Sequence, residues 1–244
     1  MRVEAPLKVS PDSTTYTSLT KDPINSIVLV FPLFLFYQFG LLLNSNNPAF
    51  TVSLGADFLT PLLYRWLGNS PWSYVAFHFA LMGLIALFVQ QKKRHQPGLP
   101  LLFGVILEGA LYAYIMGGVI VQILVQMGLQ PLGLSLAPME SVILSAGAGI
   151  YEEAVFRLFL LGGLLWCFQQ MRFPVTVSLF VALIFSSLVF SAFHFHPFGG
   201  DSWLLYSFAY RALAGVVFAV LYLTRGFAVA VYTHALYDLF VLLI

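Results

Sequence analysis

Residues 146–166 read AGAGIYEEAVFRLFLLGGLLW. This stretch keeps two glutamates, Glu152 and Glu153, and one arginine, Arg157, among small and apolar residues. Glu153 and Arg157 are spaced i,i+4, which places them on one face of a helix and within reach of each other. Glu152 lies about 100° around the same helix and finds no oppositely charged residue at helical spacing. Its partner must come from elsewhere in the fold, or the residue is kept for chemistry.

The composition indicates a membrane protein. Of the 244 residues, 60% are hydrophobic and 9% are charged, and the mean hydropathy is +0.89. Soluble domains carry roughly 25% charged residues, so a soluble enzyme and a disordered chain are both excluded. The net charge of +1 gives no reason to expect a nucleic-acid partner. The single Cys167 cannot form an intrachain disulfide, and its apolar surroundings predict a buried, inert thiol.

Seven stretches are long and apolar enough to be membrane spans, each of which needs about 20 residues. The predicted fold class is therefore all-α, a polytopic membrane bundle of about seven helices with a catalytic cavity inside the membrane. A further stretch, 50–67, contains Asp57 and Arg65 and is expected to be re-entrant or interfacial, or an eighth span. The seven predicted spans are 24–43, 73–90, 99–127, 141–170, 174–195, 203–223 and 226–244.

The first 23 residues are polar and lack the apolar core and cleavage site of a secretory signal. We expect them to be a flexible or surface-lying lead of unassigned function. Residues 24–244 show no internal repeat and no composition shift, which predicts a single transmembrane domain. The charged motif residues place its catalytic helical core at about 140–244.

The positive charges of the loops predict the orientation of this domain in the membrane. Lys and Arg occur at 92–95, Arg172 and Arg225, whereas the intervening loops 128–140 and 196–202 contain none. Because cytoplasmic loops carry the excess of Lys and Arg, the first group is predicted to face the cytoplasm. The chain is thus expected to be a multi-pass protein of the cell membrane.

Three further ionisable residues fall in predicted spans and offer partners to the glutamates. His194 lies near the end of the fifth span, and His234 and Asp238 are i,i+4 on one face of the last span. An ionised group at the centre of a membrane helix costs about 2.5–3.5 kcal/mol on insertion scales, so such groups usually face inward. We therefore expect the three helices to adjoin and to enclose a polar, hydrated site.

These residue types are the ones that activate water. A carboxylate can accept a proton from water and a histidine can orient that water, while further polar groups can hold a metal or stabilise an oxyanion. The sequence has neither a G-x-S-x-G nor an H-E-x-x-H motif. The residues alone leave peptide hydrolysis and a proton relay both open.

Three motifs in order give a more specific indication. They are EEAVFR at 152–157, FSAFH at 190–194 and HALYD at 234–238. They match E-E-x-x-x-R, F-x-x-x-H and H-x-x-x-N/D, and the chain over about 140–244 resembles the CAAX-protease and bacteriocin-processing (Abi) family of intramembrane proteases. Type II CAAX prenyl endopeptidases belong to that family.

The resemblance implies an intramembrane endopeptidase acting on a membrane-associated, prenylated or exported peptide. By the same resemblance Glu152 is the general base on the water, and His194 shares in its activation. His234 and Asp238 would polarise the scissile carbonyl. Arg157 is expected to keep Glu153 ionised, so that Glu153 orients the site while Glu152 acts as the base. The peptide substrate and the lipid bilayer are the expected partners, with the oligomeric state open.

Asp238 stands where asparagine would be most expected, and this raises the possibility of a metal. An ionised aspartate has no N–H to donate to an oxyanion, so Asp238 must be protonated, orient His234, or bind a metal. Glu152, His194, His234 and Asp238 form an acceptable ligand set for a divalent metal such as zinc. The prediction leans toward a metal and leaves a metal-free mechanism open.

Two functions of other classes compete with proteolysis. One is a non-catalytic immunity or assembly factor on the same fold, against which the intact motif residues argue. The other is a proton-coupled transporter, whose usual paired halves are not seen in this sequence.

Smaller predictions concern residues outside the motifs. Glu108 and Arg211 are expected to pair with each other, and His78 to be an ordinary core histidine. His196 is expected at the interface, and Phe190 is expected to serve in packing. Small-residue spacing predicts close helix contacts at Gly147, Gly149, Gly162 and Gly163.

Overall fold

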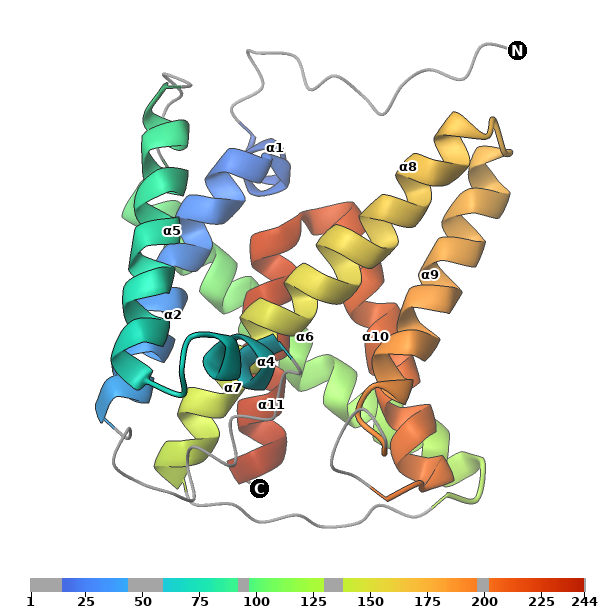
Figure 1. Ribbon diagram of the computed structural model, residues 1–244. Coiled ribbons are helices and arrows are strands. Elements are labelled where there is room, and N and C mark those ends of the chain that lie inside the picture. The colour runs from blue at the N-terminus through green and yellow to red at the C-terminus, as the bar shows by residue number, and fades with distance from the viewer. Residues whose placement is uncertain (1–14, 44–58, 92–96, 130–137, 197–201, 244) are drawn as a thin grey trace.

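The computed structural model describes residues 15–43, 59–91, 97–129, 138–196 and 202–243. This part of the chain is a bundle of helices joined by turns (Figure 1). In chain order they are α1 (Tyr16–Lys21), α2 (Pro23–Leu43), α4 (Leu59–Trp66), α5 (Pro71–Gln91), α6 (Leu99–Gln126), α7 (Pro138–Glu153), η2 (Ala154–Leu161), α8 (Gly162–Gln170), α9 (Val175–Ala192), α10 (Leu205–Arg225) and α11 (Phe227–Leu243).

Five helices in the described residues, α2, α5, α6, α9 and α10, are long and apolar enough to cross a membrane. The chain is therefore an integral, multi-pass membrane protein. The predicted count of seven spans additionally requires the α7–α8 stretch and α11, whose apolar part, Phe227–Val241, is shorter. That count stays a prediction.

The stretch 50–67 is described only in part, as the eight-residue helix α4. A helix of this length rises about 12 Å, at 1.5 Å per residue, and cannot cross a bilayer. In addition, α2 ends and α5 begins at the same end of the bundle (Figure 1). Both observations favour the interfacial interpretation over an eighth span.

The fourth predicted span is longer and less regular than expected. It begins at Pro138, three residues before the predicted start, and runs through α7, η2 and α8 to Gln170. The middle segment, η2, is a π-helix that begins directly after Glu153. π-Helical turns are rare and occur frequently at functional sites. No residue pattern in the stretch predicts the change from α-helix to π-helix.

Two glycines of this stretch allow close helix packing, as predicted. A Cβ atom on Gly147 would collide with the Tyr37 ring of α2, and one on Gly149 would lie 2.9 Å from the Val231 carbonyl oxygen of α11. The expectation is wrong for Gly163, which has no atom of another residue within 4 Å of such a Cβ. A Cβ on Gly162 would make only an ordinary contact, 3.6 Å from the Tyr222 hydroxyl of α10, so the approaches that require glycine are those at Gly147 and Gly149.

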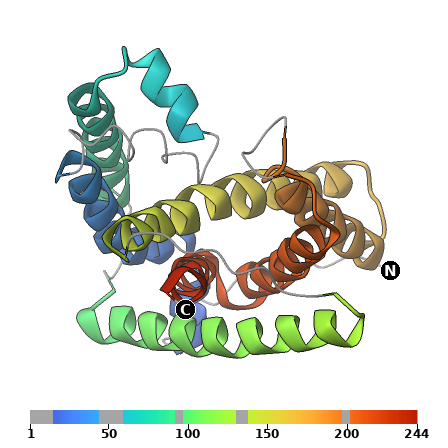
Figure 2. The ribbon, with the colours of Figure 1, turned by 90° about the horizontal axis from the view of Figure 1, so that it is seen from below.

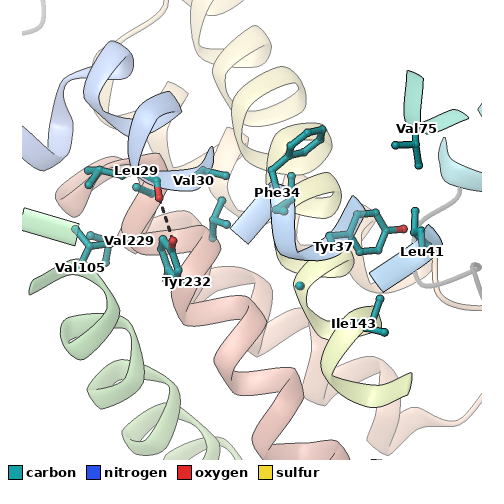
Figure 3. Close-up of a cluster of buried hydrophobic side chains, with 14 of the residues drawn as sticks. Leu29, Val30, Phe34, Tyr37, Leu41, Val75, Val105, Ile143, Val229 and Tyr232 are labelled. Atoms are coloured by element: carbon teal, nitrogen blue, oxygen red, sulfur yellow. Dashed lines mark hydrogen bonds between the residues drawn. The ribbon is translucent and has the colours of Figure 1, made fainter. Parts of the chain in front are cut away.

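Helix α11 occupies the centre of the bundle, between α6 and α7 (Figure 2). Its residues Val229, Ala230 and Val231 have no exposed surface. Val229 and Val231 belong to an apolar cluster in which the Tyr232 hydroxyl donates to the Leu29 carbonyl oxygen of α2 at 3.0 Å (Figure 3). This packing fixes the helix that carries His234 and Asp238.

Part of the polar lead is packed against the bundle. Residues 16–21 form α1, Thr20 is completely buried, and the Ser26 hydroxyl donates to the Thr20 carbonyl oxygen at 3.1 Å. Gly226, with φ of 99°, passes so close to Thr20 that no Cβ would fit. Residues 15–22 are therefore docked at the α10–α11 turn, while the earlier part of the lead lies outside the described residues.

The predicted pair of Glu108 and Arg211 is wrong. Glu108 Oε1 accepts from Arg225 Nε at 2.5 Å, and its Oε2 accepts from the Tyr16 hydroxyl at 2.7 Å. Arg211 lies instead over the ring of Phe195, 5.4 Å from its centroid. Nothing in the sequence indicated this arrangement, because one of the two partners of Glu108, Tyr16, comes from α1, 92 residues away in the chain. Burial and the Glu108 hydrogen bond raise the pKa of the Tyr16 phenol, which keeps it a donor.

Cys167 also differs from its prediction, because it is exposed on α8. The helix turns this face away from the bundle. In a membrane such a face contacts hydrocarbon, which accommodates a thiol without a protein core around it.

Candidate active site

Two glutamates at the end of α7 meet an arginine of η2, a histidine just after α9, and a histidine and an aspartate of α11. The site thus draws on three parts of the chain that are far apart in sequence. Its members are Glu152, Glu153, Arg157, His194, His234 and Asp238.

Glu153 forms the buried anchor of the site. Its side chain is fully buried, and Oε1 lies 3.1 Å from Arg157 Nη1 and 2.7 Å from His234 Nδ1. Because a carboxylate only accepts hydrogen bonds, the Nδ1–H of His234 is the donor. Glu153 therefore joins α7 to α11 and fixes which nitrogen of His234 faces away from it.

Arg157 is held by both charge and aromatic rings. Its Nη2 donates to the Gly215 carbonyl oxygen of α10 at 3.2 Å, and its guanidinium lies 4.4 Å from the Phe190 ring centroid. Such contacts stabilise a desolvated cation. Phe190, expected to serve in packing, thus contacts the charged centre directly.

Glu152 faces both imidazoles. Its Oε2 lies 3.6 Å from His194 Nε2 and 3.8 Å from His234 Nε2. The two glutamates differ as the spacing suggested, since Glu153 contacts Arg157 and Nδ1 of His234 whereas Glu152 contacts the two Nε2 atoms.

Two further contacts define the roles of the imidazole nitrogens. His194 Nδ1 donates to the Phe190 carbonyl oxygen at 2.9 Å, so in the neutral ring Nε2 is left as a lone-pair acceptor. His234 Nε2 lies 3.4 Å from Asp238 Oδ2. Glu152 and Asp238 thus both face Nε2 of His234, where a proton or a polar substrate atom can be held.

The site opens on one side. The side chains of His194 and Asp238 are 24% and 27% exposed, whereas those of Glu152 and His234 are 6% and 3% exposed. The two more exposed residues lie just after α9 and in the second half of α11, and both helices run downward in Figure 1. The catalytic cavity itself stays a prediction.

A comparison with protein families identifies this part of the chain. Residues 134–240 match the family of type II CAAX prenyl endopeptidase Rce1-like proteins. The segment is Rce1-like. The predicted resemblance to the CAAX proteases is thereby confirmed, and the match includes every site residue named above. No curated protein and no solved structure matches the chain.

The Rce1-like segment was also expected to supply metal ligands. Among the described residues, no group of three or more His, Cys, Asp or Glu is arranged so that it could hold a metal ion. The donor set of Glu152, His194, His234 and Asp238 thus does not fit a metal as it stands. Metal binding remains a prediction for experiment.

Two residues of α10 that contact the site were not predicted. Gly215 supplies the carbonyl oxygen that binds Arg157, and the Phe218 ring stacks on the His234 imidazole. Neither belongs to the three motifs of the Rce1-like segment, and α10 contains a second phenylalanine, Phe208, among many other apolar residues. Only the packing of α10 against α9 and α11 distinguishes them.

Proposed function

We propose that the chain is an intramembrane endopeptidase that hydrolyses a peptide bond with water activated by Glu152. The observation that supports it best is the position of Glu152 Oε2, which faces Nε2 of both His194 and His234 at 3.6 and 3.8 Å. The match of residues 134–240 to the Rce1-like family supports protease activity in general.

In the proposed mechanism a water molecule binds beside Glu152 and His194. Glu152 accepts a proton from the water as its oxygen adds to the carbonyl carbon of the peptide. His194 Nε2, which accepts because Nδ1 donates to Phe190, holds the second water proton. When the C–N bond breaks, Glu152 returns its proton to the leaving amine nitrogen.

His234 is proposed to stabilise the oxyanion of the tetrahedral intermediate. Its Nδ1–H is held by Glu153 at 2.7 Å, so the ring is oriented before substrate binds. When it carries both protons it donates from Nε2 to the developing charge. Before the substrate binds, Asp238 Oδ2, 3.4 Å from Nε2, accepts a hydrogen bond from this Nε2–H. In the tetrahedral intermediate the substrate oxyanion accepts that hydrogen bond instead.

The substrate is proposed to be a membrane-embedded or exported peptide. The partly exposed His194 and Asp238 lie at the end of the bundle opposite the turns that carry Arg172 and Arg225 (Figure 1). Because those basic turns are predicted to be cytoplasmic, the site leans toward the outer leaflet. A prenylated tail in the cytosol would reach it poorly.

The test compares the membrane and secreted peptides of cells that express the wild-type protein or Glu152→Gln. At least one peptide is expected to stay uncut only in the variant, whose folding should be unchanged. Glu108→Gln is the control, because it alters a glutamate of α6 that is outside the site. Substantial cleavage by Glu152→Gln would disprove the assignment, and uptake by purified protein in liposomes without any cleavage would favour a transporter.

A further inference from the structure

The geometry points to Phe218 of α10 as a positioning residue that holds the His234 imidazole in its working orientation. Phe218 lies outside the three motifs, and its apolar ring stacks on the His234 imidazole without supplying a reacting group. The role rests on the proposed function where activity is concerned, but the orientation of the ring can be measured without any substrate.

The first evidence is the contact between the two rings. The centroids of Phe218 and His234 lie 4.3 Å apart and the ring planes differ by 16°, which is a stacked arrangement. Phe190 approaches the same imidazole edge-on, at 5.7 Å and 76°. The two phenylalanines thus contact the His234 ring in two different ways, and only Phe218 lies parallel to it.

The second evidence is that Phe218 is itself immobilised. Its side chain is 1% exposed, and its ring meets those of Phe190 and Tyr237 edge-on at 6.4 and 6.0 Å. A ring packed from several directions has a defined rotamer. It can therefore act as a rigid surface for the imidazole.

A rigid surface is needed because the hydrogen bonds of His234 do not fix its plane. The bond from Nδ1 to Glu153 is short at 2.7 Å, but the contact of Nε2 with Asp238 is long at 3.4 Å, so the ring can still tilt about Nδ1. A tilt would carry Nε2 away from Glu152, which is already 3.8 Å distant. Stacking on Phe218 opposes the tilt, and this keeps Nε2 directed at Glu152 and Asp238.

Phe218 also lies beside the charged anchor. The Arg157 guanidinium is 5.3 Å from its ring centroid, and Arg157 Nη2 donates to Gly215, three residues before Phe218 on the same helix. Helix α10 therefore supports both halves of the site, the Glu153–Arg157 pair and the His234 ring. This connection gives a helix without motif residues a direct part in the geometry of the site.

The test uses Phe218→Leu, with Phe34→Leu as the matched control. Phe34 is also a buried phenylalanine, 6% exposed, but it packs in the apolar cluster around α2 and away from His234. Histidine-labelled protein is studied by ¹⁵N NMR in detergent micelles. The five histidines of the chain give few signals, and that of His234 is identified by its loss in His234→Gln.

In the wild type and in Phe34→Leu, His234 should show one fixed state with a proton on Nδ1. In Phe218→Leu its two ¹⁵N signals should move toward each other or broaden, and Phe218→Tyr, which keeps the ring, should restore them. If the proposed protease function holds, kcat of Phe218→Leu should fall on the order of 10- to 100-fold with KM nearly unchanged, as for a displaced catalytic group.

The possible results distinguish the positioning role of Phe218 from the proposed protease function. Altered His234 signals with no proteolytic activity in any form of the protein would support the positioning role and reject the proposed function. A wild-type His234 that already exchanges between states would overturn the positioning role even if Phe218→Leu fails to fold. Unchanged signals in a folded Phe218→Leu would overturn it as well.

Discussion

At the level of single residues, the adjacent glutamates occupy different environments. Glu153 is fully buried and shared between Arg157 and His234, whereas Glu152 faces two Nε2 atoms near the open side. Adjacent positions on a helix point about 100° apart, and here that angle separates an anchor from a proposed base. The two residues should therefore respond differently to the same substitution.

Glu153→Gln is expected to lower the free energy of unfolding by about 3–5 kcal/mol, because it leaves the Arg157 cation buried without its carboxylate. Glu152→Gln should lower stability less, by about 1 kcal/mol, because its contacts with the imidazoles of His194 and His234 are longer, at 3.6 and 3.8 Å. Thermal unfolding in detergent measures both. The double variant Glu153→Gln, Arg157→Met should recover most of the lost stability, and equal destabilisation by the two single variants would contradict this division.

A second prediction for single residues concerns Asp238, the aspartate of the third motif. Asp238→Asn should keep cleavage within about 10-fold of the wild type, because the amide can present an oxygen to His234 Nε2 and an N–H to the oxyanion. Asp238→Ala should lose far more activity. Both are measured with the substrate found by comparing wild-type and Glu152→Gln cells.

Treatment with a chelator shows which role of Asp238 is correct. Activity of the wild type that is lost on chelation and restored by added zinc would establish the predicted metal. A much weaker affinity for that metal in Asp238→Asn would then make Asp238 a ligand. Activity that survives chelation and metal-free reconstitution would leave the orienting role.

At the level of elements, α1 ties the N-terminal part of the chain to the α10–α11 turn. Arg225 bonds both Glu108 of α6 and the Thr17 hydroxyl of α1, at 2.5 and 3.3 Å. Its guanidinium also lies 5.6 Å from the Tyr16 ring centroid. This clamp joins α1 and α6 to the α10–α11 turn.

The clamp predicts energetic coupling between Glu108 and Arg225 that is absent between Glu108 and Arg211. A double-mutant cycle of Glu108→Gln with Arg225→Gln should give a coupling of about 1.5–3 kcal/mol, the range for hydrogen bonds to charged groups. The same cycle with Arg211→Gln should give a value near zero. Unfolding in detergent measures both cycles. A larger coupling with Arg211 would restore the pairing expected from sequence.

Sequence reasoning succeeded where the cost of burying charge left few choices. Six ionisable residues in apolar spans had to converge, and Glu152 does lie within 4 Å of both His194 and His234. Sequence reasoning failed where more than one residue of the same type could have made the same contact. Glu108 had two possible arginine partners in α10, Arg211 and Arg225, and the same helix has two phenylalanines, Phe208 and Phe218. Only three-dimensional packing could select Arg225 and Phe218. The π-helical turn after Glu153 was likewise without a sequence signal.

At the level of the whole molecule, successive helices run in alternating directions. The α8–α9 and α10–α11 turns and the start of α2 lie at one end of the bundle, and the ends of α2, α6 and α11 lie at the other (Figure 1). Arg172 and Arg225 both belong to the first end. One orientation in the membrane therefore places both of these basic turns on the cytoplasmic side.

This orientation predicts which residues are accessible from outside the cell. In a Cys167→Ser background, Gln126→Cys at the end of α6 should react with a membrane-impermeant maleimide in intact cells. Gln91→Cys at the end of α5 should react only after permeabilisation, because a single span, α6, separates the two positions. The reverse labelling pattern would mean that the protein has the opposite orientation in the membrane. His194 and Asp238 would then lie toward the cytoplasm, and a cytosolic prenylated tail would be the better candidate substrate. Reaction of both in intact cells would mean that α6 does not span the membrane.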